Sequence, residues 1–215
     1  MSSKETATKI LDAALALFRE QGFESTTMRQ IAEKAGVATG LAYYYFQSKD
    51  AIVLAFYHRA QLDLPSMLES AHKERDLTAR LRAIIDAKFR YFAPNRLFLG
   101  ALMGHAADPH NALSPFGPGS ATVREADIAQ YDRALKETRT KVHADLAPHM
   151  AKMLWFYQMG MILFWIYDRS ANQKRTKDLL AASVPVVVTL IKVSNLPLVG
   201  PMRKNAVKII SILTA

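Results

Sequence analysis

Hydrogen-bonding side chains of several kinds are concentrated between residues 26 and 49, in the sequence TTMRQIAEKAGVATGLAYYYFQSK. The potential donors are Thr27, Arg29, Thr39, Tyr43, Tyr44 and Lys49. Hydroxyl, phenol, guanidinium and ammonium groups are the donors with which proteins hold phosphate oxygens and base edges. We find no nucleophile elbow, glycine-rich phosphate loop or pair of catalytic carboxylates in the sequence. The stretch therefore indicates binding of a polar, negatively charged partner rather than catalysis.

Two short helices must position these donors. Thr27 and Gln30 have the spacing of a capping box, in which each side chain satisfies a free backbone N–H at the start of a helix. A helix is therefore predicted to begin at Met28. Gly36 is predicted to end it, because glycine adopts the left-handed conformation of a helix C-terminus without steric cost.

The second helix is predicted over residues 39–45. Residues at i, i+3, i+4 and i+7 share one face of a helix, and the inner face so defined comprises Ala38, Leu41, Ala42 and Tyr45. The outward residues are Thr39, Gly40, Tyr43 and Tyr44. Such a face suits the groove of B-form DNA. Two short helices joined by a glycine turn form a helix-turn-helix, whose second helix enters the major groove.

This stretch resembles the helix-turn-helix of TetR-family repressors, and the resemblance covers roughly residues 7–57. The matching positions are Phe18, Gly22-Phe23, Thr27, Ile31-Ala32, Ala35-Gly36-Val37, Gly40, Tyr43, Phe46 and Lys49. The resemblance implies phosphate contacts from Thr27, Tyr43 and Lys49. It also implies base-edge or close backbone contacts from Arg29, Thr39, Gly40, Leu41 and Tyr44.

Three positions depart from the family pattern. Ala38 replaces the common capping serine, and Leu41-Ala42 replaces a pair that is usually small and polar, then large and apolar. Leu41 is therefore either a core residue or a contact to a thymine methyl group. Taken alone, the run of tyrosines from Tyr43 to Tyr45 would also fit an aromatic stripe in a helical core. The surrounding pattern favours DNA binding.

The composition is that of a globular protein with a basic surface. The chain has 215 residues, a net charge of +9 and no cysteine, and it begins without the basic and apolar pattern of a secretory signal. We expect a cytoplasmic protein. Residues 1–50 hold six basic and six acidic side chains, whereas residues 151–215 hold nine and two. The basic C-terminal third is either a solvated face or a site for an anionic ligand or a nucleic-acid backbone.

The rest of the chain shows helical periodicity, and we predict an all-α fold. An N-terminal three-helix DNA-binding domain at residues 1–50 is followed by a larger helical effector-binding and dimerisation domain at residues 51–215. A connecting helix is expected from Ser48 until Pro65 kinks or breaks it, and residues 48–64 are the candidate coupling element. Further helices are expected at about 77–93, 95–106, 121–147, 149–169, 173–194 and 202–213.

Aromatic and methionine side chains in the larger domain of residues 51–215, called the body below, suggest a small-molecule pocket. Residues 153–167 are apolar on all faces and too short to span a membrane. The candidate ligand-binding residues are Phe89, Phe92, Met103, Trp155, Tyr157, Gln158, Met161 and Trp165. The same side chains would also fill an ordinary core, and the sequence does not separate the two readings.

His105, Asp108 and His110 have a spacing that could bind a metal, but polar turn residues reach such spacings by chance, so we predict no metal and no cofactor. Residues 179–193 form a second nearly apolar helix, and the two helices together present more apolar surface than one small core can bury. A homodimer would bury the excess and would space two recognition helices on DNA.

The sequence thus predicts a ligand-responsive transcriptional regulator. We expect a dimeric repressor that binds a near-palindromic operator and is released by a small apolar or aromatic effector. The alternatives are a small-molecule carrier or enzyme that uses the aromatic body, and a DNA-binding protein without an effector.

Overall fold

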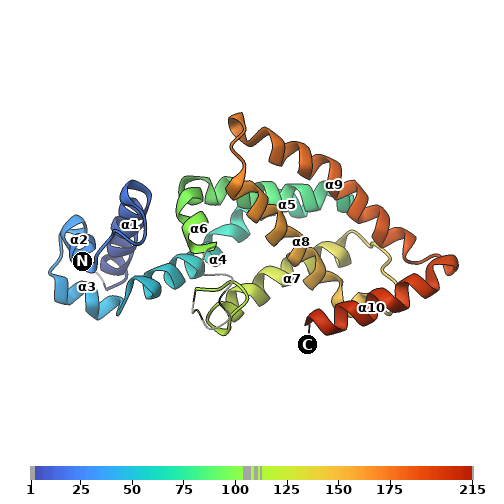
Figure 1. The fold of residues 1–215 in the computed structure, drawn as a ribbon, viewed down its shortest axis with the longest axis horizontal. Helices are drawn as coiled ribbons and strands as arrows, with labels where there is room; N and C mark the ends of the chain where they lie inside the picture. Colours follow the sequence, from blue (N-terminus) through green and yellow to red (C-terminus); the bar gives the residue numbers. More distant parts are fainter. Residues whose placement is uncertain (1–2, 104–107, 109–110, 112, 215) are drawn as a thin grey trace. The chain divides into compact units, whose positions relative to one another are not determined.

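The computed structural model describes residues 3–103, 108, 111 and 113–214 of the chain (Figure 1). The described residues form α-helices joined by turns and short 3-10 helices, with no strand among them. The α-helices are α1 (Ser3–Gln21), α2 (Met28–Ala35), α3 (Thr39–Tyr45), α4 (Lys49–His72), α5 (Leu77–Phe92), α6 (Arg96–Met103), α7 (Ala121–Glu137), α8 (Ala147–Tyr167), α9 (Lys174–Val193) and α10 (Gly200–Thr214). The 3-10 helices are η1 (Ala93–Asn95), η2 (Pro118–Ser120), η3 (Ala171–Gln173) and η4 (Pro197–Val199). The all-α prediction is confirmed.

The chain forms two compact units. The first comprises Met1–Asp63 and Tyr91–Arg124, and the second comprises Leu64–Arg90 and Glu125–Ala215. Helices α4, α5 and α7 each contribute to both units.

The first unit contains the predicted three-helix DNA-binding domain of residues 1–50, called the head below. In it α1 packs on α2 and α2 packs on α3 (Figure 1). Helix α1 buries one apolar face in this domain, with Ile10 and Ala14 fully inaccessible to solvent. An aromatic cluster extends this core to α6. The ring of Phe98 stacks on Phe18 with centroids 4.9 Å apart and lies 6.1 Å from the ring of Phe56 on α4.

The second unit has its own core. Its fully buried side chains include Leu77, Leu81 and Ile84 of α5, Tyr131 of α7 and Val184 of α9. The turn between α8 and α9 is held by Asp168, whose carboxylate accepts hydrogen bonds from the N–H groups of Ser170 and Thr176 and from the Thr176 hydroxyl. Burial raises the pKa of Asp168, but these hydrogen bonds outweigh it and hold the pKa well below its ordinary value.

The structure bears on two sequence predictions about helix ends, and the second of them was wrong. Pro65 was expected to kink or break α4, and it does not break the helix, which continues through Pro65 to His72. The proline removes one N–H, but Pro65 is exposed, so water can satisfy the carbonyl left without a partner. The helix expected to extend to residue 147 ends at Glu137, because Arg139 adopts a left-handed conformation with φ of 51°. The Thr138 hydroxyl also hydrogen-bonds to the carbonyl of Ala134.

No single helix among the described residues is long and apolar enough to cross a membrane. Residues 171–193 and 197–212 would pass such a test only as a pair, and the two segments are bent by 97°.

Candidate nucleic-acid interface

The entry to the helix-turn-helix has the predicted capping box. The Gln30 N–H donates to the Thr27 hydroxyl oxygen at 3.3 Å, and the Thr27 N–H donates to the Gln30 side-chain oxygen at 2.8 Å. At the other end of α2, Gly36 is left-handed with φ of 64°, and the N–H groups of Gly36 and Val37 bond back to the carbonyls of Glu33 and Ala32. These two caps fix the length of α2 and therefore the start of α3.

Helix α3 buries little of itself against the head. Ala42 is fully buried, whereas Leu41, Tyr43 and Tyr44 are 40%, 49% and 80% exposed. The inner face expected from helical spacing was therefore partly wrong, because Leu41 and Ala38 lie in solvent. Ala42 and the half-buried Tyr45 hold this short helix against the core of the head. Two roles were left open for Leu41, and its exposure excludes the role of a core residue.

Gly40 lies on the exposed side of α3, where no packing demands a glycine. A Cβ atom added there would meet nothing within 4 Å, and the backbone is ordinary helix. Alanine would stabilise the isolated helix better than glycine does. What the glycine provides is a bare backbone that a partner can approach closely.

Lys49 is engaged inside the head. Its ammonium group donates to the carbonyls of Phe23 at 2.6 Å and Glu24 at 3.3 Å, and lies 4.4 Å from the Phe23 ring centroid. It therefore ties the start of α4 to the turn between α1 and α2, and one of its three N–H donors is left for another acceptor. Ser48 caps the start of α4, because its hydroxyl accepts a hydrogen bond from the Ala51 N–H at 3.1 Å.

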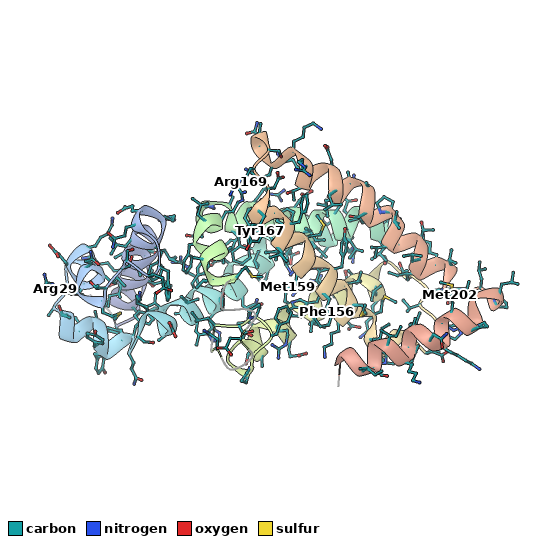
Figure 2. All side chains as sticks on the ribbon, in the orientation of Figure 1. Arg29, Phe156, Met159, Tyr167, Arg169 and Met202 are labelled. Carbon is teal, nitrogen blue, oxygen red and sulfur yellow. The ribbon has the colours of Figure 1, made fainter. Side chains whose placement is uncertain are left out.

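The other predicted DNA contacts lie on exposed parts of the head. Thr27, Arg29 and Thr39 are exposed, and Figure 2 shows Arg29 extending outward from α2. Lys34, by contrast, forms an ion pair with Glu20 at 2.7 Å. Tyr45 is half-buried and donates to the hydroxyl of Ser3 at 3.3 Å, so the three consecutive tyrosines do not form one core stripe.

The body contains a buried polar network that sequence analysis missed. Lys88 of α5, 2% exposed, forms an ion pair with Asp127 of α7 and donates to the Gln158 side-chain oxygen, which also accepts from Tyr131. The Gln158 amide donates to Asp127 at 2.8 Å. Burial lowers the pKa of Lys88 and Asp127 opposes the shift, while burial raises the pKa of Tyr131 well above its ordinary value.

The sequence did carry a signal for this network. Leu81, Ile84, Ile85 and Lys88 occupy positions i, i+3, i+4 and i+7 of one helix, so the lysine continues an apolar face. A charged residue in that place needs a buried partner.

The structure gathers some of the predicted ligand-binding residues. In the second unit, the Phe89 ring stacks on Trp165 at 5.1 Å, and the Tyr157 hydroxyl lies 2.6 Å from that of Ser183. Trp155, Gln158, Met161 and Trp165 are buried. Phe92 and Met103 belong to the first unit, where Phe92 packs edge-on against Phe56 at 5.9 Å. Side chains of α8 also reach the surface, as Figure 2 shows for Tyr167.

Of the three candidate metal residues, His105 and His110 lie outside the described residues. Within the described part of the chain, no three histidine or carboxylate side chains are close enough together to hold a metal ion.

Comparison with known proteins agrees with this geometry. Residues 10–56 match the family of bacterial regulatory proteins of the tetR type, and residues 80–205 match the tetracyclin repressor-like C-terminal domain. The chain is 33% identical over 103 residues to TtgW of Pseudomonas putida, an uncharacterized HTH-type transcriptional regulator, covering 46% of this chain and 77% of TtgW. Further curated relatives, among them SrpR of Pseudomonas putida, are matched over less than half of their length.

Solved structures share the fold at low identity. A TetR regulator from Haloarcula marismortui superposes with a TM-score of 0.68 at 17% identity, covering 87% of this chain and 98% of the other. A SmeT–triclosan complex superposes with a TM-score of 0.61 at 22% identity, covering 85% and 90%.

The fold and the head define a helix-turn-helix DNA-binding transcription regulator. The chain belongs to the TetR family, since the two family models together span most of it. Family membership sets aside the enzyme alternative.

Proposed function

We propose that this regulator is a repressor that binds a near-palindromic operator as a homodimer and releases it when a small apolar or aromatic effector binds the body. Residues 1–50 form the DNA-binding domain, and residues 51–215 form the effector-binding and dimerisation domain.

The observation that carries the operator-binding part is the unpartnered face of α3. Leu41, Tyr43 and Tyr44 are large side chains held in solvent around the bare backbone of Gly40. We assign Thr27, Tyr43 and Lys49 to phosphates. Arg29, Thr39, Gly40, Leu41 and Tyr44 are assigned to base edges or to close approach in the groove.

Dimerisation is supported by an apolar face on α9. Val186 and Leu190 are 57% and 61% exposed, and Val193 follows them at helical spacing with 36% exposure. A two-fold contact would bury this face on both copies at once. Replacing Leu190 by glutamate is expected to convert the dimer into a monomer in light scattering. A dimer of unchanged mass would exclude this face from the interface.

The effector is proposed to bind the aromatic part of the second unit, against Phe89, Trp155, Tyr157, Gln158, Met161 and Trp165. Phe92 and Met103, in the first unit, stay sequence predictions. SmeT, a fold relative, was solved with triclosan, so the architecture can hold a small molecule. An effector shifts operator binding only by its differential affinity for two shapes of the body. Residues 48–64, which comprise the cap and the first part of α4, are the proposed link to the head, and Phe56 packs there against Phe98.

The operator-binding role is tested by replacing Tyr44 with alanine and measuring affinity for a selected operator by fluorescence anisotropy. Loss of an 80% exposed side chain leaves the head folded. We expect operator affinity to fall about tenfold or more, because the variant loses one or two contacts to DNA. Tyr167 of α8, 68% exposed, is the matched control, and its replacement by alanine should leave affinity unchanged. Equal affinities for both variants would remove α3 from the interface.

A further inference from the structure

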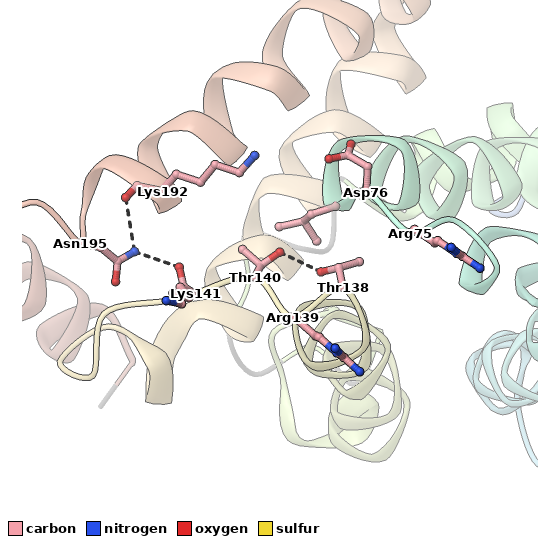
Figure 3. Close-up of a pocket in the computed structure, with 9 residues that line it drawn as sticks. Arg75, Asp76, Thr138, Arg139, Thr140, Lys141, Lys192 and Asn195 are labelled. Carbon is pink, nitrogen blue, oxygen red and sulfur yellow. Dashed lines mark hydrogen bonds between the residues drawn. The ribbon is translucent and has the colours of Figure 1, made fainter.

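A polar pocket of about 340 Å³ lies within the second unit (Figure 3). Three segments of the chain form it: the turn into α5, the turn after α7 and the C-terminal end of α9. Its lining residues are Arg75, Asp76, Leu77, Thr138, Arg139, Thr140, Lys141, Lys192 and Asn195. None of them is among the residues assigned above to DNA or to the effector.

The pocket has an excess of positive charge that the protein does not neutralise. Figure 3 shows the Lys192 ammonium extending toward the Asp76 carboxylate, and this lysine contributes to the lowered pKa of Asp76, whose largest cause is a hydrogen bond from the Ala79 N–H. Within the described residues, the charged groups of Arg75, Arg139 and Lys141 have no ion-pair partner. Three cations therefore border one pocket without a counterion.

Neutral groups with hydrogen-bonding capacity lie at the centre of the pocket. The hydroxyls of Thr138 and Thr140 are 2.8 Å apart, and Figure 3 shows them bonded between the charged side chains. The Asn195 amide donates to the carbonyl of Lys141 at 2.9 Å, which ties the turn after α7 to the end of α9. The pocket thus combines a tied backbone with hydroxyl groups and exposed cationic side chains.

Arg139 occupies a backbone position that favours glycine. Its N–H bonds to the Lys136 carbonyl and the Thr140 N–H bonds to the Leu135 carbonyl, which is the same C-terminal motif that Gly36 forms at the end of α2. With φ of 51°, a side chain here is less favourable than it is in the ordinary helical region. The fold alone would be served better by glycine, so replacing Arg139 by glycine removes the guanidinium group without destabilising this turn.

We propose that this pocket is a binding site for a small organic phosphate, a molecule that carries a diphosphate or closely spaced phosphate groups. Guanidinium groups bind phosphate oxygens in a bidentate manner, and ammonium and hydroxyl groups supply further donors. The volume lies at the lower end of small-molecule sites, which begin at about 300 Å³.

The test is a calorimetric titration of the full-length protein with inorganic pyrophosphate, at two sodium chloride concentrations. We expect saturable binding of one pyrophosphate per chain that weakens as salt screens the charges. Replacing Arg75 or Lys141 by alanine should each weaken binding about tenfold, the value of one lost charge-assisted contact. Replacing Lys204 by alanine, an exposed lysine of α10 outside the pocket, should change nothing.

Arg139→Gly separates binding from folding. This variant should bind pyrophosphate about tenfold more weakly while its thermal midpoint does not fall. Equal losses in all variants, Lys204→Ala included, would mean diffuse charge attraction and would overturn the proposal. Displacement of pyrophosphate by duplex DNA lacking an operator would assign the pocket to a nucleic-acid backbone and also overturn it. Operator binding is not part of this test, so either proposal can fail without the other.

Discussion

Replacing Gly40 by alanine separates what α3 needs for folding from what it needs for binding. The added Cβ meets nothing within 4 Å, so it creates no clash in the free protein. Alanine is more favourable than glycine by up to about 1 kcal/mol inside a helix, and we take about 0.5–1 kcal/mol for a residue in the first turn. For a chain of this size the thermal midpoint should rise by about 1–4 °C.

Operator affinity should move in the opposite direction. If DNA approaches the bare backbone at Gly40, a methyl group holds it away and the neighbouring contacts lengthen. Loss of one such contact corresponds to about a tenfold increase in Kd. The assay pairs differential scanning fluorimetry with anisotropy titration of a labelled operator.

The matched control is Gly160→Ala in the body helix α8. Its added Cβ also lies in open space, so it should raise stability without weakening operator binding. Unchanged or tighter operator binding by Gly40→Ala would refute the docking of α3. A lower thermal midpoint would instead refute the claim that the position is free of packing.

Three further changes test the body. Asp127→Asn leaves the buried Lys88 ammonium without its carboxylate and should lower the free energy of unfolding by about 3 kcal/mol in urea titration. The double variant Lys88→Met with Asp127→Leu removes both charges and should lose much less stability. Equal losses in the two variants would show that the pairing of the two charges does not matter there. Because the pKa of Asp168 is lowered in the folded state, its contribution to stability is complete above pH 3.8, the unfolded value, and is lost as the pH falls below it. The parent should therefore lose thermal stability in that acid range more steeply than Asp168→Asn, and parallel curves would contradict this. Effector titration of Trp165→Ala should show weaker release from the operator, and unchanged release would move the effector site elsewhere.

The head was predictable because its signals are local. The Thr27–Gln30 capping box and the left-handed Gly36 depend on residues a few positions apart, and both are found as predicted. The exposure of Leu41 was not predictable, because α3 is short and packs on the core through Ala42 and Tyr45 without it. Periodicity assigns a residue to a face but does not say whether a neighbour covers that face.

The body was less predictable because its interactions join distant parts of the chain. The Lys88–Asp127–Gln158 network links three helices. Its one signal in the sequence is a lysine on an otherwise apolar helix face. The end of α7 depends on Arg139 in a conformation that residue type does not favour. The pocket that Arg139 lines combines segments more than 50 residues apart in the sequence, and no sequence motif predicts such a combination.

The central claim, that α3 of a dimer reads an operator, is tested most directly by selecting bound fragments from genomic DNA with the purified protein and titrating the best fragment at two salt concentrations. We predict an enriched inverted repeat whose half-sites lie about one helical turn apart, bound with an affinity that falls as salt increases. Recovery of fragments without a shared repeat, or an affinity that does not differ from that of bulk DNA, would contradict the account.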